Sequence, residues 1–274
     1  MDGDFAVKDI LTGVLGQLSP QASASLAGSL ARDRFRAYVR PFGGDQAAGS
    51  RLYVLDVELA GALLELVHFA EVLLRERIHR ELTSVDGPQW YNDPRHVLDY
   101  RTRGAIAKAS NRLPTRFSPG QMVAELNFGT WAGLFEQGGQ IKHRDGSFVR
   151  QADYDADLWA PALHSVFDRE WPSVTRIDAE GLLRRVRNGR NRISHHESLV
   201  FGIHQHGERT PGGKFRRQPI GSFLSDVRRL IQVLDSSMGK WLDTCDHAEE
   251  LLRDSLALRA DQYAQGHLRN REWI

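Results

Sequence analysis

The sequence predicts an all-α protein, a helical bundle, and three observations support this class. Apolar residues recur at three- and four-residue spacing over residues 52–82, as in a helix buried on a wide face. Proline and glycine pairs separate further stretches of the same kind. No stretch shows a convincing alternating strand pattern. With 274 residues, 41% of them hydrophobic, the chain has ample material for a core.

We expect three regions along the chain. Residues 1–50 form an N-terminal helical segment that packs on the core, with a first helix over residues 5–18. Ser19 and Pro20 begin a second helix, and the polar run up to Ser50 is a loop. The remaining regions are a helical domain and then a C-terminal helix with a tail, over residues 51–245 and 246–274.

Aromatic residues and a polar stretch mark the middle of the chain. We expect four aromatic residues in the core, because burying large rings stabilises a fold strongly: Trp90, Tyr91, Trp131 and Phe135. The runner-up role for Trp90 and Tyr91 is base stacking. One helix is expected over residues 123–135, where glycine lets another segment approach closely. The polar, glycine-containing residues that follow, 138–155, are expected to form a loop.

Charge and cysteine content narrow the class of protein. A net charge of +1 does not indicate general coating of nucleic acid, whereas local arginine clusters suit a confined anion site. Cys245 is the only cysteine, which excludes an intrachain disulfide and a cysteine-based zinc site. No apolar run approaches the ~20 residues that span a bilayer, and the N-terminus lacks signal-peptide features. We therefore expect a cytoplasmic protein with no membrane partner.

Residues 187–197 concentrate the reactive side chains of the chain. The stretch reads RNGRNRISHHE, and Ile193 is its only apolar anchor. Arginine offers a planar donor fork suited to phosphate, and histidine moves protons near neutral pH. A proton shuttle and an anion clamp are what cleavage of a phosphodiester needs. The alternative is a solvated, arginine-rich helix face.

Three segments together resemble one known family. Arg190, Asn191 and His195 resemble the R-N-x3-H motif of HEPN ribonucleases, and RNRISHHE is similar to the signature of the Abi-like (abortive infection) family of that superfamily. The helix over residues 52–82 and the block VAELNFGTWAGLF also resemble this family, in the same order along the chain. One departure is Glu76, which stands where the family commonly has asparagine.

The resemblance implies a HEPN-type helical bundle that cleaves RNA without a metal or cofactor, as a homodimer. His195 would act as general base or acid, Arg190 would neutralise the phosphorane oxygens, and Asn191 would orient the histidine or the phosphate. Abortive infection, phage defence or toxin activity would be its role, with an antitoxin or a phage-derived trigger as a further partner. The runner-up is a non-catalytic HEPN-like module that binds RNA or a nucleotide.

The identity of the catalytic histidine stays open. His196 also satisfies the general motif spacing from Arg190. We prefer His195, because on a helix Asn191 and His195 stand at i and i+4 and share a face. The contiguous pair and Glu197 would fan apart on a helix, so no metal site is expected.

The charged residues around the motif have two interpretations each. Arg187 is expected to bind phosphate or pair with a partner. Arg192 and Glu197 either pair on the surface or take part in the site. Glu71 and Arg75 orient the motif residues if the resemblance holds, or they form an ion pair with each other.

Overall fold

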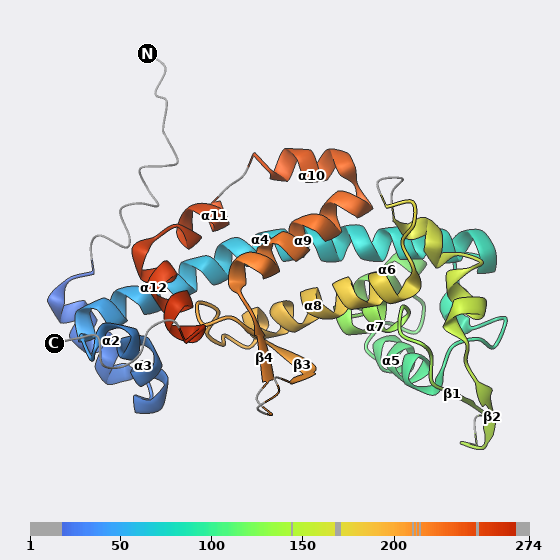
Figure 1. Cartoon of the computed structure of the whole chain (residues 1–274). Helices are drawn as coiled ribbons and strands as arrows, with labels where there is room; N and C mark the ends of the chain where they lie inside the picture. Colours follow the sequence, from blue (N-terminus) through green and yellow to red (C-terminus); the bar gives the residue numbers. More distant parts are fainter. Residues whose placement is uncertain are drawn as a thin grey trace, which may run out of the picture. The chain divides into compact units, whose positions relative to one another are not determined.

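The computed structural model describes residues 18–143, 145–167, 171–209, 211, 213, 215–244 and 247–266 (Figure 1). Over these residues the protein is mostly helical, which confirms the predicted class in its coarse form. The helix predicted over residues 5–18, apart from its last residue, and Cys245 lie outside the described ranges. Within those ranges we find no helix with the length and apolar character needed to cross a membrane.

The chain forms two compact units. Three long helices contribute residues to both: α4 (Gln46–Asp86), α8 (Arg176–Ser194) and α9 (Ile220–Leu234). The first unit comprises Met1–Leu64, Arg192–Leu224 and Asp246–Ile274, and the second comprises Glu65–Asn191 and Ser225–Cys245. Three of the four boundaries between the units therefore fall inside helices.

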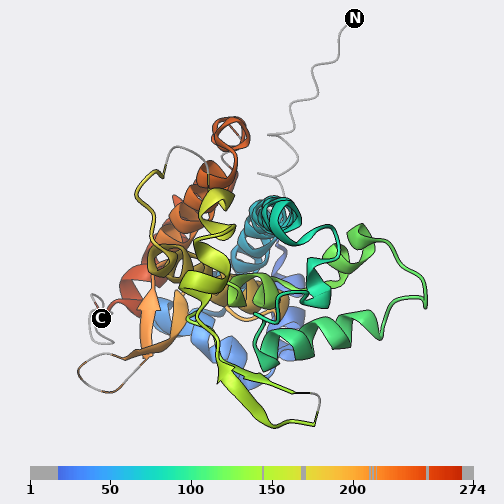
Figure 2. The ribbon, with the colours of Figure 1, turned by 90° about the vertical axis from the view of Figure 1, so that its right-hand side faces the viewer.

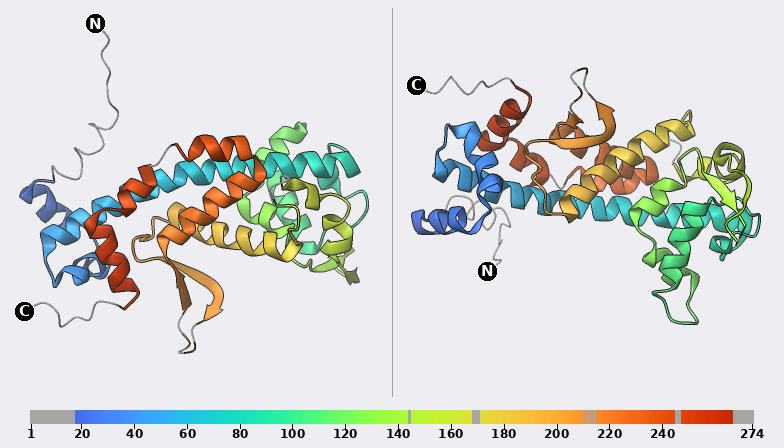
Figure 3. Two further views of the ribbon diagram at one scale, coloured as in Figure 1. Left: turned by 45° about the horizontal axis from the view of Figure 1, so that its top comes forward. Right: turned by 90° about the horizontal axis from the view of Figure 1, so that it is seen from below.

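The first unit combines short helices with one hairpin. Its own elements are α2 (Pro20–Ser29), α3 (Arg32–Val39), the 3₁₀ helix η1 (Arg40–Phe42), β3 (Ile203–Arg209), β4 (Phe215–Gln218), α11 (His247–Leu252) and α12 (Ser255–Ala264). The Ser19 side chain accepts a hydrogen bond from the amide of Ala22 at 3.1 Å and caps α2, as predicted. Helix α12 contacts η1, and in Figure 3 the red C-terminal helix lies next to the blue N-terminal helices.

The start of α4 lies earlier than predicted. The helix begins at Gln46, so the expectation of a loop up to Ser50 is wrong. The Asp45 carboxylate accepts hydrogen bonds from the amides of Ala47 and Ala48, at 2.9 and 3.1 Å. This side-chain cap satisfies amides that have no partner within the helix, and it starts the helix in a polar stretch.

The second unit carries most of the aromatic core. Its own elements, several of them visible in Figure 2, are η2 (Trp90–Asn92), α5 (Tyr100–Ser110), α6 (Pro119–Glu125), α7 (Phe128–Gly133), β1 (Gln140–Lys142), β2 (Phe148–Gln151), the π-helical η3 (Asp155–Trp159), the 3₁₀ helix η4 (Leu163–Val166) and α10 (Ser236–Leu242). Trp90, Tyr91, Trp131 and Phe135 are all buried, which confirms that they belong to the core. The rings of Trp90 and Trp131 lie 5.9 Å apart.

The predicted helix over residues 123–135 is two helices. Leu126 is extended and ends α6, and Asn127 begins α7 by accepting a hydrogen bond from the amide of Thr130 at 2.9 Å. Asparagine competes for backbone amides in this way and favours a new helix start over continuation. The expectation of one continuous helix is therefore wrong.

Two antiparallel hairpins are present, although no stretch of the sequence shows a convincing strand pattern. Strands β1 and β2 pair Ile141 with Arg150, within the stretch expected to be a loop. Strands β3 and β4 pair Ile203 with Gln218. Strands β1, β2 and β4 have only three or four residues, and β2 has no buried residue, so no alternating apolar pattern marks these three strands in the sequence. They are a small addition to a helical protein.

Candidate functional site

Helix α8 carries most of the motif, and its N-terminus is held firmly. The amide of Thr175 donates to the Asp178 carboxylate at 3.0 Å, and the amide of Asp178 donates to the Thr175 hydroxyl at 3.2 Å. These reciprocal bonds resemble a capping box. The Thr175 hydroxyl also donates to the Asp178 carboxylate at 2.6 Å, and this bond, together with the bond from the Thr175 amide, holds the pKa of Asp178 below its usual value. The buried Arg176 donates to Asp155 and to the carbonyl of Phe135, both at 2.8 Å. Both contacts lie within the second unit.

Glu71 contacts the motif directly. Its Oε2 atom lies 3.4 Å from the Nε atom of Arg190, and both side chains are half-buried. The Nε atom of Arg75 lies 3.5 Å from Glu76 Oε1 instead. The alternative in which Glu71 pairs with Arg75 is therefore wrong. An ion pair at this distance positions the Arg190 guanidinium and leaves most of its five N–H donors for other partners.

Arg187 lies over a glycine of the second unit. A Cβ atom at Gly129 would stand 3.9 Å from the Cδ atom of Arg187, which agrees with the close approach expected at that glycine. The Nη1 atom of Arg187 is 3.4 Å from Glu136, and Glu136 also accepts a hydrogen bond from Arg101 at 2.9 Å. Arg187 thus shares a carboxylate with a second arginine, which leaves this cluster with net positive charge.

Helix α8 ends at Ser194 in a Schellman turn. The amide of Glu197 donates to the carbonyl of Arg192 at 3.0 Å, and the amide of His196 donates to the carbonyl of Ile193 at 3.1 Å. This pair of bonds defines the motif, and its left-handed position is usually glycine. Here that position is His196, with φ of 53°.

The two histidines therefore occupy the turn rather than the helix. His195 is the first residue after α8, and both His195 and His196 are exposed, as is Asn191. The geometric preference for His195 assumed a helix that continues through it, and α8 stops one residue earlier. Arg190 and Asn191 belong to the second unit, and the histidines belong to the first.

The left-handed histidine supports a stability prediction. His196→Gly should raise the free energy of unfolding by about 0.5–1 kcal/mol, because left-handed backbone costs a residue with a Cβ about 1–2 kcal/mol, and the freedom of glycine in the unfolded chain offsets part of the gain. Urea unfolding measures this change. His196→Ala is the matched control and should give no gain. Equal effects of the two variants would contradict the argument from φ.

Arg192 makes two contacts beside the turn. Its Nη1 atom lies 3.1 Å from the Glu197 carboxylate, which confirms that these residues pair. Its Nη2 atom donates to the carbonyl of Ser198 at 3.1 Å. Arg192 therefore fastens the start of the segment that follows α8.

A buried carboxyl, missed from the sequence, holds the same segment further on. Asp56 is 5% exposed and accepts hydrogen bonds from the amides of Leu199 and Val200, each at 3.0 Å, and from the hydroxyl of Tyr38 at 2.6 Å. Burial raises the pKa of Asp56, and these hydrogen bonds offset part of that effect. Asp56 thus connects the chain just after the histidines to α4 and α3 within the first unit.

Comparisons with protein families, with curated proteins and with solved structures give no significant match to this chain. The similarity of the motif to HEPN ribonucleases therefore stays a prediction. Within the described ranges no three histidine, cysteine, aspartate or glutamate side chains form a group that could hold a metal ion. The chemistry available from the described motif residues is that of arginine, asparagine and histidine.

Proposed function

We propose that this protein is a metal-independent endoribonuclease that uses Arg190, Asn191 and His195. The observation that supports this best is the Glu71–Arg190 ion pair at 3.4 Å, and Asn191 and His195, which follow Arg190 in the sequence, are exposed. An arginine with a purely structural role does not require a histidine in the same motif. Cleavage of a phosphodiester requires both a positioned guanidinium and a solvent-accessible group that transfers protons. The three residues also stand in the order and spacing of the R-N-x3-H motif that the sequence resembles.

In the proposed reaction His195 removes the proton of a ribose 2′-hydroxyl. The 2′-oxygen then forms a bond to phosphorus, and the bond from phosphorus to the 5′-oxygen breaks. A general acid, the His195 of a second copy, protonates the departing 5′-oxygen, so the products are a 2′,3′-cyclic phosphate and a 5′-hydroxyl. Arg190 stabilises the charge that develops on the phosphorane oxygens, and Asn191 orients the phosphate or the histidine.

The proposal includes a homodimer and a biological setting. A two-fold axis would bring two copies of one motif to a single substrate, which supplies the acid and the base from the same residue type. An abortive-infection, phage-defence or toxin role on cytoplasmic RNA, restrained by an antitoxin or released by a phage-derived trigger, rests on the family resemblance alone.

The test is cleavage of an end-labelled, structured RNA by the purified protein in EDTA. We expect cutting, with 2′,3′-cyclic phosphate ends, and none of the same strand when its 2′-hydroxyls are methylated. Cleavage that requires added divalent metal, or products with 3′-hydroxyl ends, would refute the mechanism. Binding of RNA without cleavage, equal in wild type and His195→Ala, would favour the non-catalytic module.

The ion pair of Arg190 supports a second prediction. Glu71→Gln should lower the single-turnover cleavage rate by about tenfold or more, because a misplaced catalytic group costs rate steeply. RNA affinity should change less than the rate. Glu76→Gln is the matched control, since Glu76 lies on the same helix and pairs with Arg75. Equal rates for the two variants would show that Glu71 does not position Arg190.

A further inference from the structure

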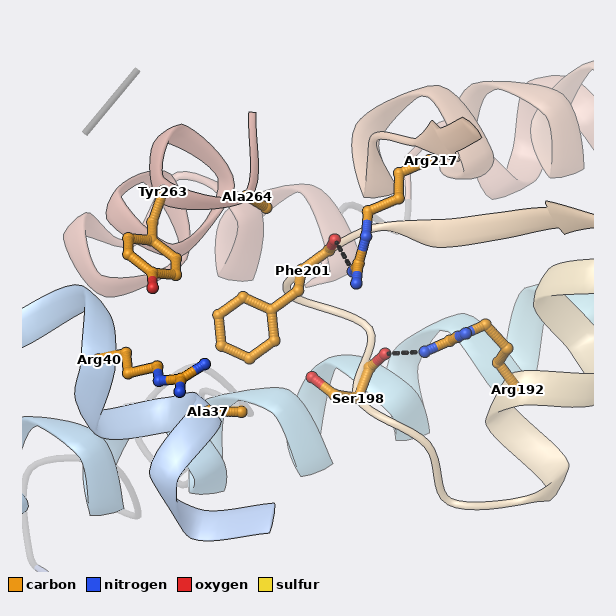
Figure 4. Close-up of a pocket in the computed structure, with 8 residues that line it drawn as sticks. All are labelled: Ala37, Arg40, Arg192, Ser198, Phe201, Arg217, Tyr263 and Ala264. Carbon is orange, nitrogen blue, oxygen red and sulfur yellow. Dashed lines mark hydrogen bonds between the residues drawn. The ribbon is translucent and has the colours of Figure 1, made fainter. Parts of the chain in front are cut away.

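A pocket of about 550 Å³ opens in the first unit, close to the turn that carries the histidines (Figure 4). Its volume falls within the range of about 300–1,000 Å³ that is typical of small-molecule sites. The side chains that define its chemistry are Arg40, Arg192, Arg217, Ser198, Phe201 and Tyr263. They come from η1, the end of α8, β4, the segment after α8, and α12.

Three arginines from distant parts of the sequence meet at this pocket. Arg217 donates to the carbonyl of Phe201 at 2.8 Å, and Arg192 pairs with Glu197. Over the ranges that the structure describes, neither Arg40 nor Arg217 has a carboxylate partner. Partial burial and the nearby charge of Arg192 lower the pKa of Arg217, although an arginine remains charged at neutral pH. Three guanidinium groups with one carboxylate leave a net positive site that an anion would stabilise.

Two aromatic side chains lie among these arginines. The rings of Phe201 and Tyr263 are half-buried and line the pocket. In Figure 4 the Phe201 ring lies between Arg40 and Tyr263 on one side and Arg217 and Arg192 on the other. Aromatic faces of this kind stack on nucleobases, and arginine forks bind phosphate oxygens.

A second pocket adjoins the first. It has a volume of about 530 Å³ and shares Phe201, Arg217 and Ala264 with its neighbour. Arg217 therefore stands in the wall between two hollows. A nucleotide whose phosphate is bound at Arg217 could place its base in the first pocket. The next nucleotide of an RNA strand could then enter the second pocket.

We propose that the pocket binds a nucleotide, with its phosphate on Arg217, Arg192 and Arg40 and its base against Phe201 and Tyr263. A free nucleotide and a nucleotide within an RNA strand share this chemistry. Binding here requires no cleavage at His195, so the proposal stands or falls independently of the nuclease reaction.

The experiment measures binding to the full chain carrying His195→Ala, which should slow cleavage if the proposed reaction holds. The probes are AMP and a short single-stranded RNA, and their binding is measured by calorimetry. Inorganic phosphate is added as a competitor of each probe. Arg217→Gln and Arg40→Gln should each weaken binding about tenfold or more, because each removes charge-assisted hydrogen bonds to phosphate. Arg36→Gln is the control: Arg36 is exposed on α3, one turn before Arg40, and lies outside the pocket.

Each outcome bears on the proposal. Binding of AMP that both pocket variants weaken identifies a free nucleotide as sufficient, and binding of RNA alone with the same sensitivity identifies a strand subsite. Arg40→Gln should leave the fold intact, because the Arg40 side chain has no hydrogen bond or ion pair within the described residues. Weaker binding by this variant would therefore not be caused by misfolding. Failure of both probes to bind, or equal binding by the pocket variants and Arg36→Gln, would overturn the proposal.

Discussion

His195→Ala is expected to slow RNA cleavage by about 10²–10⁴-fold, the usual contribution of a positioned general acid or base. If both copies of a dimer use this residue, the loss should lie at the upper end. Single-turnover cleavage of labelled RNA in EDTA measures the effect. RNA affinity should change little, because in the proposed reaction His195 transfers protons while Arg190 contacts the phosphate.

The matched variant is His196→Gly. Glycine suits the left-handed backbone at this position, so the variant keeps the Schellman turn and removes only the second imidazole. Its cleavage rate should stay within a few-fold of wild type. If His196→Gly abolishes cleavage and His195→Ala does not, the catalytic assignment belongs to His196. Alanine at residue 196 is a poorer test, since it retains the backbone strain.

Asp56→Ala is expected to lower the free energy of unfolding by about 3 kcal/mol or more, since it leaves buried donors of Tyr38, Leu199 and Val200 without an acceptor. Urea unfolding measures the loss. Tyr38→Phe, which removes one of these donors, should cost about 1 kcal/mol. A loss for Asp56→Ala no larger than that of Tyr38→Phe would contradict the anchoring role.

The same carboxyl predicts a pH dependence. Because burial raises the pKa of Asp56 above its unfolded value of 3.8, the folded state holds this proton more tightly than the unfolded state. Its contribution to stability is therefore fully present below pH 3.8 and is lost as pH rises through the folded pKa. Asp56→Asn lacks this titration, so the stability of wild type relative to Asp56→Asn should fall across that window. A difference that rises with pH would show that hydrogen bonding outweighs burial.

The periodic apolar pattern of the sequence made the helical class predictable. The exact starts and ends of helices depend on single capping side chains and were not predictable. The apolar repeat of α4 is strong enough to predict from sequence, because its leucines recur on one face. Its true start depends on one aspartate side chain, Asp45, within a polar run that reads as a loop. The break at Asn127 depends on a cap in the same way. Strands as short and exposed as β2 carry no periodic signal.

The residues of the candidate site could be predicted from the sequence, but the contacts that they make could not. The motif could be recognised from its residue types, yet the choice of Arg190 as the partner of Glu71 depends on tertiary packing. Asp56 carried a faint signal, because it stands four residues after Leu52 and three before Leu59, on the buried face of the helix. A carboxylate at such a position requires buried partners. Its two backbone donors, the amides of Leu199 and Val200, lie 143 and 144 residues away along the chain, where no local pattern points to them.

The unit boundaries inside α4, α8 and α9 have a consequence for dissecting the protein. Domain boundaries usually fall in exposed linkers, where a chain can be divided with little damage. Here a division between residues 191 and 192 would cut α8 and leave new helix ends with unpaired backbone groups. It would also assign Arg190 to one fragment and His195 to the other. A split-protein reporter built on that division would regain the proposed ribonuclease activity only when both fragments reassemble the motif.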